Sequence, residues 1–429
     1  MNAKNSAISQ FYRRPMAERR AIAKAWAGLN PEDMSALRNA GLTEAEAELM
    51  IENVIGRYSL PFALATNFRI NESDYLIPKV IEESSVVAAC SFAAKLFRRA
   101  GGFSASSDEP VMIGQIQLLD LADLEEAAQL ILAHKGKLLA QINEGAGSIV
   151  KRGGGALNLE IRKFEGTRIG DMLVIHLHFD TRDAMGANAI NSALERIAPS
   201  IERISGGRVN LRILSNLSDR RLARASGMIE ADTLATEGAS GAEVVDAIIE
   251  AAALAEIDPY RAATHNKGIM NGIDALMLAT GNDWRAAEAG AHAYAARDGQ
   301  YTSLTTWWKD QDGDLHGRIE LPLAAGIVGG ATRAHRGAQT ALKILGVESA
   351  RELAEVAAAV GLAQNFAAIR ALATDGIQRG HMRMHARQLA LAAGATAEAA
   401  PDIARQMVDS GNIRLEAAKE IVEQKKRGR

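Results

Sequence analysis

The chain has 429 residues, of which 48% are apolar and 24% charged, and its formal net charge is −3. This length exceeds what one simple core organises, so we expect two or three domains of a soluble globular protein. The balanced charge excludes the basic footprint of a general nucleic-acid-binding protein, and no uninterrupted apolar run is long enough to span a bilayer.

We expect a cytoplasmic protein. A single cysteine, Cys90, excludes an intrachain disulfide and suits a reducing compartment. The opening sequence MNAKNSAISQFYRR lacks the apolar segment of a signal peptide. The basic end at residues 425–429 is short, and we interpret it as a solvated tail. We therefore expect neither a nucleic acid nor a membrane as a partner.

Residues 15–56 predict short helices. Pro31 follows Asn30, which is the pattern of a helix first turn. Thr43-Glu-Ala-Glu46 is a capping box that starts a further helix, and we expect Gly56 to close it.

A predicted hairpin of strands 62–70 and 75–80 leads directly to an acidic residue. Ser84 and Ser85 then precede a predicted helix over 86–100, which they can cap. Glu83 therefore falls at a strand-to-helix junction, where the helix N-terminus lowers the pKa of a carboxyl group. A proton-donating role for it requires an opposing influence, such as a second carboxylate nearby.

Residues 110–217 change character and predict a compact inserted domain. The predicted order is β-α-β-β-α-β, which is the ferredoxin-like split unit, and no G-x-G-x-x-G follows a strand as in a Rossmann fold. The predicted strands are 111–119, 157–164, 172–179 and 209–214, and the predicted helices are 124–142 and 187–204.

The hexapeptide Asp183-Ala-Met-Gly-Ala-Asn188 opens the second of these helices directly after a strand. Free backbone N–H groups point out of a helix start, and Gly186 allows a pyrophosphate to approach closely. A lone glycine at a helix start is weak evidence by itself, and close packing is the alternative interpretation.

The remainder of the chain predicts a mixed helical and sheet body, so the fold class is α+β. Apolar residues 323–330 end in Gly329-Gly330, a turn or close-contact point, and glycines 376 and 380 suggest hinges before a small helical flap. The other predicted elements are helical residues 230–255 with Thr233 and Ser240 as caps, a hairpin of 303–308 and 315–321, and helices 337–345, 350–373 and 381–391, followed by a helix pair from 396.

The stretch from Arg261 to Arg285 organises the rest. Residues 273–279 form a short apolar run, which we interpret as a buried strand, and Asn282 or Asp283 can cap a following helix over 284–297. Lys267 and Asp283 then lie at the two ends of one buried element. A lysine held by a carboxylate can stabilise a developing oxyanion, and the alternative is a purely structural ion pair.

Two histidines, His381 and His385, share a helix face and invite a metal interpretation. The residues between them are Met-Arg-Met, and no third ligand is evident, so we predict no metal. The alternative role for such a histidine is that of a general acid near neutral pH.

Three separate motifs together resemble one family. His265–Asp274 with the following ATGNDWR, Asp183–Asn188 and Glu52–Gly56 are similar to 3-hydroxy-3-methylglutaryl-coenzyme A reductase, of the soluble bacterial-type class. The resemblance is collinear from about residue 50 to about residue 390.

The resemblance implies the site residues, each in matching text. The catalytic residues are Glu83, Lys267, Asp283 and His381; the substrate-binding residues are Ser85, Arg261, Asn271, Gln364 and Asn365; the cofactor-binding residues are Ala146, Asp183, Ala184, Met185, Gly186, Ala187, Asn188 and Asn216.

The resemblance also implies a reaction, in which NAD(P)H reduces hydroxymethylglutaryl-coenzyme A twice, to mevalonate and coenzyme A. Lys267 stabilises the charged oxygen, Glu83 transfers a proton, Asp283 holds both in register, and His381 protonates the coenzyme A thiolate. Family sites are built at a dimer interface, so we expect a homodimer or an assembly of dimers. The residues leave the direction of the reaction open.

The cofactor is NADPH or NADH, and the residues favour NADPH. Family members that use NADH often carry an aspartate ahead of the triple-glycine turn, here residues 153–155, whereas Ala146 occupies the matching position. Lys151 and Arg152 lie close by, and cations accept the extra phosphate of NADPH. A second departure is Ser84, where many soluble members have proline.

Two other functions stay open. One is an oxidoreductase of a different acyl-coenzyme A or aldehyde on the same scaffold, and the other is a silent protein that binds coenzyme A and nucleotide. The predicted divisions are a substrate-binding large domain in two parts (1–109 and 219–375), a ferredoxin-like dinucleotide-binding domain (110–218) and a C-terminal helical flap (376–429).

Overall fold

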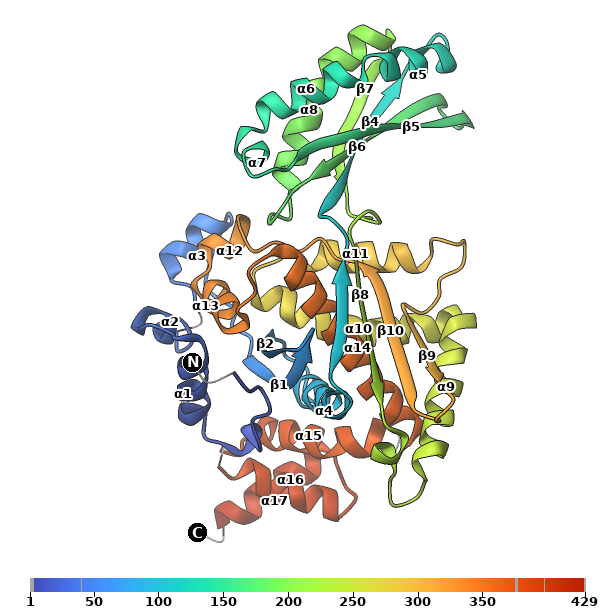
Figure 1. Cartoon of the computed structure of the whole chain (residues 1–429). Helices are drawn as coiled ribbons and strands as arrows, with labels where there is room; N and C mark the ends of the chain where they lie inside the picture. Colours follow the sequence, from blue (N-terminus) through green and yellow to red (C-terminus); the bar gives the residue numbers. More distant parts are fainter. Residues whose placement is uncertain (1–3, 40, 375–376, 397, 428–429) are drawn as a thin grey trace.

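The larger of two β-sheets organises the lower body of the molecule (Figure 1). The computed structural model describes residues 4–39, 41–374, 377–396 and 398–427. The larger sheet has six strands in the order β2-β1-β3-β8-β10-β9. These are β1 (Phe62–Ile70), β2 (Ser73–Val80), β3 (Phe103–Ser107), β8 (Leu222–Ile229), β9 (Thr305–Lys309) and β10 (Leu315–Pro322).

Helix α14 (Ala350–Ala373) is the central helix of this body. It packs against β3, β8 and β10, and against helices α4 (Val86–Arg99) and α10 (Pro259–Ala279). Within the described residues it is the one helix long and apolar enough to cross a membrane, but 67% of its most apolar window is buried inside the protein. The core helix of a soluble protein passes the same test. The body also contains α9 (Gly241–Ile257), α11 (Trp284–Ala295), α12 (Gly330–Ala334), α13 (Arg336–Leu345) and the 3₁₀ turn Ala231–Leu234.

The smaller sheet forms an upper body with its own apolar core (Figure 1). Its strands lie in the order β5-β6-β4-β7, and each neighbouring pair is antiparallel. This order confirms the ferredoxin-like prediction. The elements are β4 (Val111–Leu119), α5 (Leu124–Ala133), α6 (Lys135–Gly145), α7 (Gly147–Val150), β5 (Gly155–Thr167), β6 (Gly170–Asp180), α8 (Ala187–Ser205) and β7 (Arg208–Ser215).

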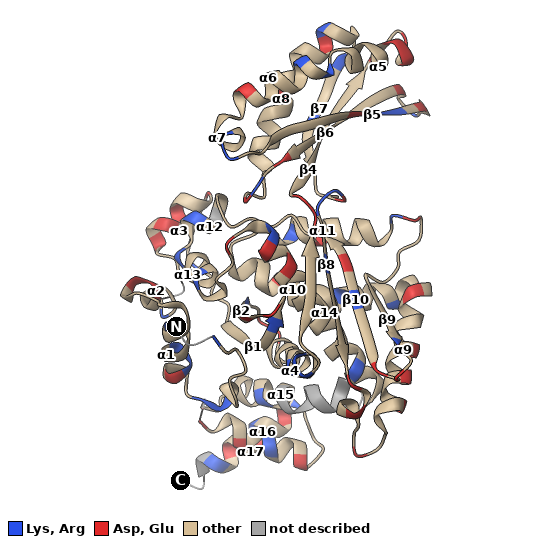
Figure 2. Ribbon diagram, viewed as in Figure 1, with Lys and Arg blue, Asp and Glu red and all other residues tan. Residues whose placement is uncertain are grey.

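Short helices at the two ends of the chain complete the lower body. The N-terminal elements are a 3₁₀ turn (Phe11–Arg13), α1 (Met16–Ala27), α2 (Pro31–Ala36) and α3 (Glu44–Met50); the C-terminal ones are α15 (Ile377–Ala392), α16 (Ala400–Asp409) and α17 (Leu415–Arg427). The C-terminal helices bury a separate small core. Charges of both signs are interspersed over the bodies (Figure 2).

The prediction of a strand at residues 273–279 is wrong, because these residues form the last turns of α10. The start signal of the helix lies far upstream, where Asp258 caps it and Pro259 occupies its first position. Helix α10 packs against α9, α14 and β2, so its apolar residues are not confined to one stripe. A short apolar run without periodicity does not distinguish a strand from a buried helix.

Smaller differences concern element ends. The helix predicted over 124–142 is two helices that meet at His134, and α3 ends at Met50 rather than near Gly56. The helical region predicted from 230 begins as a regular helix only at Gly241. Strands β3 and β8 were not predicted at all.

Candidate active site

Glu83 and Lys267 form the centre of the candidate site. Glu83 lies in the turn between β2 and α4, and Lys267 lies on α10. The Lys267 Nζ donates a hydrogen bond to Glu83 Oε2 at 3.0 Å, and Asn271 Nδ2 donates to the same oxygen at 3.4 Å. The Lys267 and Glu83 side chains are 60% and 36% exposed, so a ligand can reach both. The fold thus joins two segments that the sequence separates widely.

Ser85 lies beside this pair in an unusual backbone conformation. It occupies the N-cap position of α4 with φ +75°, and its side chain makes no capping hydrogen bond. The expectation that this serine caps the helix is therefore wrong. A left-handed conformation costs a non-glycine residue about 1–3 kcal/mol and concentrates at functional sites. The strained turn keeps the Ser85 hydroxyl available next to Glu83.

Asp283 does not lie beside Glu83 and Lys267 within one chain. Its carboxylate caps α11 by accepting from the Ala286 N–H at 3.1 Å. Helix α10 continues from Lys267 to Ala279, a rise of about 18 Å at 1.5 Å per residue. The sequence-based expectation that Asp283 holds Lys267 and Glu83 in register is therefore not met by a single copy.

Two predicted substrate contacts, Gln364 and Asn365, lie in the core on α14. Gln364 Oε1 accepts from the fully buried Lys79 Nζ at 3.1 Å. Asn365 Oδ1 accepts from Trp307 Nε1 at 2.9 Å, and its amide lies 3.0 Å from His265 Nε2. Because these polar groups are used internally, both residues support the fold around α10. Burial lowers the pKa of His265 to about 3, so this imidazole is neutral.

Arg261, the remaining predicted substrate contact, lies near the start of α10, where Asp258 accepts from its backbone N–H at 3.2 Å. Desolvation lowers the pKa of its guanidinium, which nevertheless stays a cation at neutral pH. His381 lies on α15, and its side chain is outside the described residues. Within the described part of the chain no group of three His, Cys, Asp or Glu side chains is arranged to hold a metal.

The predicted cofactor motif has the geometry of an anion site. Gly186 is the N-cap of α8 with φ +100°, and no side chain caps the helix. A Cβ at Gly186 would come within 2.2 Å of Thr181 Cγ2, so the position requires glycine. The uncapped start of a long helix leaves backbone N–H groups for a diphosphate, which fits a dinucleotide. Asp183 points elsewhere, because its Oδ1 accepts from the Ala350 N–H of α14 at 2.9 Å.

Ala146 and Asn216, two further predicted cofactor residues, lie outside the motif. Ala146 lies between α6 and α7, shortly before exposed Lys151 and Arg152. The guanidinium of Arg182 donates to the Gly153 carbonyl and holds the glycine turn near the motif. Asn216 lies at the end of β7, where its carbonyl is so close to Gly290 that a Cβ there would be 2.6 Å away.

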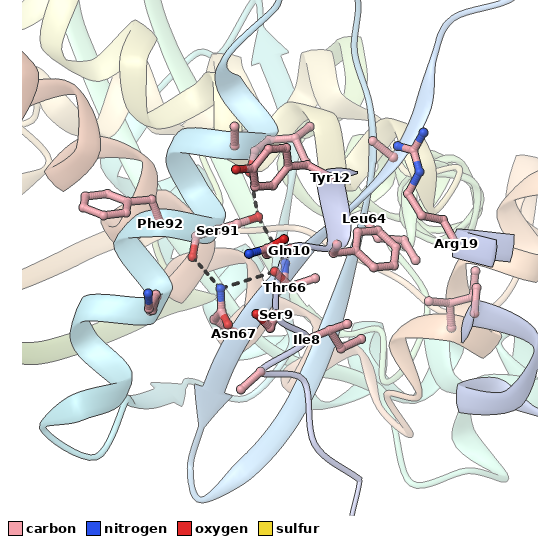
Figure 3. A pocket seen from close by; sticks show the side chains of 18 of the residues that line it. Ile8, Ser9, Gln10, Tyr12, Arg19, Leu64, Thr66, Asn67, Ser91 and Phe92 are labelled. Carbon is pink, nitrogen blue, oxygen red and sulfur yellow. Dashed lines mark hydrogen bonds between the residues drawn. The ribbon is translucent and has the colours of Figure 1, made fainter. Parts of the chain in front are cut away.

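A cavity of about 1020 Å³ between the N-terminal segment, β1 and α4 was not predicted from the sequence (Figure 3). Val87, Ser91, Phe92 and Lys95 line it along one face of α4, which begins beside Ser85. Tyr12 and Arg19 approach from the N-terminal segment. The helical spacing of Lys95, Arg98 and Arg99 on α4 is a sequence signal that could have pointed to this cavity. Arg98 and Arg99 lie at the far end of the same face.

An uncapped helix start on the small body and an open acid–lysine pair on the large one are features that fit a dinucleotide-dependent oxidoreductase. A family model described as hydroxymethylglutaryl-coenzyme A reductase matches residues 15–386. The chain belongs to this family.

Three known relatives match between 79% and 98% of the chain. The 3-hydroxy-3-methylglutaryl-coenzyme A reductase of Archaeoglobus fulgidus is 51% identical over 98% of this chain and 95% of its own length. A probable reductase from Borreliella burgdorferi is 37% identical over 79% of this chain and 77% of its own. The class II enzyme of Streptococcus pneumoniae, solved bound to NADPH, is 42% identical with a TM-score of 0.81, covering 96% of this chain and 100% of that one.

Proposed function

We propose that this chain interconverts 3-hydroxy-3-methylglutaryl-coenzyme A and mevalonate plus coenzyme A, with NADPH as the cofactor. The observation that carries the proposal is the Lys267–Glu83 hydrogen bond of 3.0 Å, open to a ligand and next to a strained Ser85. The dinucleotide supplies hydride for both reductions. The first turn of α8 behind Gly186 would hold its diphosphate, and Lys151 and Arg152 would pair with the extra phosphate.

The acid–lysine pair accounts for the charge and proton movements. As the thioester carbonyl is reduced, negative charge develops on its oxygen, and the Lys267 ammonium stabilises that charge. Glu83 shares a hydrogen bond with this ammonium and is placed to give a proton to the oxygen. In the second reduction, of the aldehyde, the same two groups act again. Asn271 donates to Glu83, and Ser85 and Arg261 lie on the same two segments as the pair. These three residues would orient the substrate.

The cavity along α4 suits the coenzyme A portion of the substrate. From Val87 to Arg99 the helix rises about 18 Å, a length that suits an extended thiol-bearing arm. The cavity's aromatic side chains, Tyr12 and Phe92, can stack on a base, and the exposed Lys95 and Arg99 of α4 can pair with phosphates. Arg98 is paired with Asp74 and is therefore used within the chain. The thiolate end would then lie near Glu83, and His381 on α15 would protonate it as it leaves.

A homodimer would complete the site. Since Lys267 lies inside α10 and Asp283 lies beyond its C-terminal end, an isologous pairing can bring Asp283 of a second copy to Lys267 of the first, and the reverse, in two equivalent sites. Asp283 would then hold the Glu83–Lys267 pair in trans. We propose the same arrangement for the cofactor motif, a cytoplasmic location, and the domain boundaries 1–109 with 219–375, 110–218 and 376–429.

The test is nicotinamide absorbance with purified protein and hydroxymethylglutaryl-coenzyme A, with NADPH and NADH in separate assays. Two NADPH oxidised for each coenzyme A released would support the proposal. Oxidation only with a different acyl-coenzyme A would favour an altered substrate. Binding of coenzyme A and nucleotide without turnover in either direction would indicate a silent binding protein.

A further inference from the structure

The apolar segment Leu323–Gly330, here called the strap, follows β10 and touches the cofactor motif. The Ile327 N–H donates to the Asp183 carbonyl at 2.9 Å, and Ala184 pairs with Val328 in an isolated parallel bridge. The strap belongs to the large body and the motif to the small one. These backbone contacts therefore fix the start of α8 relative to the large sheet.

The other side of the strap holds the turn that carries Asp283. The Gly326 N–H donates to Asn282 Oδ1 at 2.7 Å, and Asn282 Nδ2 donates to Thr280 Oγ1 at 3.0 Å. Both ends of the Asn282 amide are thus used inside the chain. A Cβ at Gly326 would lie 2.6 Å from the Met185 nitrogen, so the strap packs too closely against the motif to accommodate a side chain at this position.

A buried guanidinium fastens the strap and the motif together. Arg221 donates to Thr181 Oγ1 at 3.1 Å, to the Ala184 carbonyl at 3.3 Å, and to the Ala325 carbonyl of the strap. Desolvation lowers the pKa of Arg221 to about 10, and the charges of Asp180 and Asp183 oppose that shift. The side chain stays cationic at neutral pH and bonds groups from both bodies at once.

We propose that the strap is a coupling element, which makes one rigid unit of the dinucleotide-binding motif and the Asp283 turn, with Asn282 and Arg221 as its positioning residues. The proposal rests on the proposed function. In the proposed dimer, the cofactor motif and the Asp283 turn would together face the Glu83–Lys267 pair of the other copy. Gly326 is in close contact with both the Asp283 turn and the cofactor motif. A shift of the Asp283 turn should therefore displace the cofactor motif, and the reverse.

The first variant is Asn282→Ala, which removes the acceptor for Gly326 on the side of the strap away from the motif. Coupling predicts that the Kd for NADPH, measured by nicotinamide fluorescence without any thioester, rises at least fivefold, within the usual range of linked sites. The kcat falls as well, because Asp283 is displaced. A purely local role for Asn282 lowers kcat and leaves the Kd for NADPH unchanged, which would overturn the proposal.

The second variant, Gly326→Ala, inserts a methyl group toward Met185 and is expected to weaken NADPH binding and lower kcat together. Gly238→Ala is its matched control, because that position has no atom within 4 Å of a new Cβ and no left-handed φ. The double variant with Asn282→Ala should be non-additive in the Kd. If Gly326→Ala fails to fold, the Asn282→Ala result decides alone. Unaltered protein that fails to bind NADPH would instead overturn the proposed function, and the coupling with it.

Discussion

Replacing Lys267 by glutamine separates a catalytic role for this lysine from a structural one. The Lys267 side chain is 60% exposed, so its ion pair with Glu83 is expected to contribute only about 0–1 kcal/mol to stability. Removing one group that stabilises a developing oxyanion lowers kcat by about 10²–10³-fold, or about 2.7–4 kcal/mol. Lys267→Gln should therefore leave the melting temperature nearly unchanged while kcat falls by this factor.

The assay is the initial rate of NADPH oxidation with hydroxymethylglutaryl-coenzyme A, alongside thermal unfolding of the same preparation. Lys309→Gln is the matched control, because Lys309 also forms an exposed ion pair with an acid, Asp246. The control should lose neither stability nor activity. A Lys267→Gln protein with kcat within about threefold of the unaltered chain would refute the oxyanion role.

Three further predictions concern the core, pH and cofactor choice. Gln364→Leu removes the oxygen that accepts from buried Lys79 and should lower the free energy of unfolding by about 1–3 kcal/mol, measured by urea unfolding. The double variant with Lys79→Met should recover most of that loss. Burial and the neighbouring Glu288 raise the pKa of Asp274 from 3.8 to about 9, so the native state keeps a proton that the unfolded chain releases, and stability falls as pH rises through this window. Asp274→Asn should therefore show a shallower fall in melting temperature between these pH values, and an unchanged slope would contradict the assignment. Arg152→Ala should raise the KM for NADPH several-fold and leave that for NADH unchanged; an equal rise for both would count against a contact with the extra phosphate.

Local signals predicted much of the fold. The strand at 111–119 was predicted to the residue, and the start of α8 at Ala187 followed from the strand-to-helix change after the motif. The cap at Thr43 was recognisable, and Asp283 was one of two candidate caps with Asn282, because a cap satisfies backbone groups within three residues of itself. Interactions between residues this close in the sequence can be recognised from the sequence alone.

The missed features depend on contacts across the chain. The end of α10 was mistaken for a strand because its apolar residues face several neighbours, and its cap at Asp258 lies far from the run. The separation of Lys267 from Asp283 follows only once the intervening residues are known to be helical. The hydrogen bonds from Arg221 to Thr181 and Ala325 join residues that are far apart in the sequence, so no local sequence pattern predicts them.

The measurement that tests the account most directly is a mixing experiment with two inactive variants, Lys267→Ala and Asp283→Ala. The two proteins are dissociated together in mild denaturant, reassembled, and assayed with hydroxymethylglutaryl-coenzyme A and NADPH. If each site takes Lys267 from one copy and Asp283 from the other, mixed dimers regain one intact site, and activity returns to about a quarter of the unaltered level for random pairing. If both residues act within one chain, every site in the mixture lacks one of them, and no activity above that of the separate variants returns.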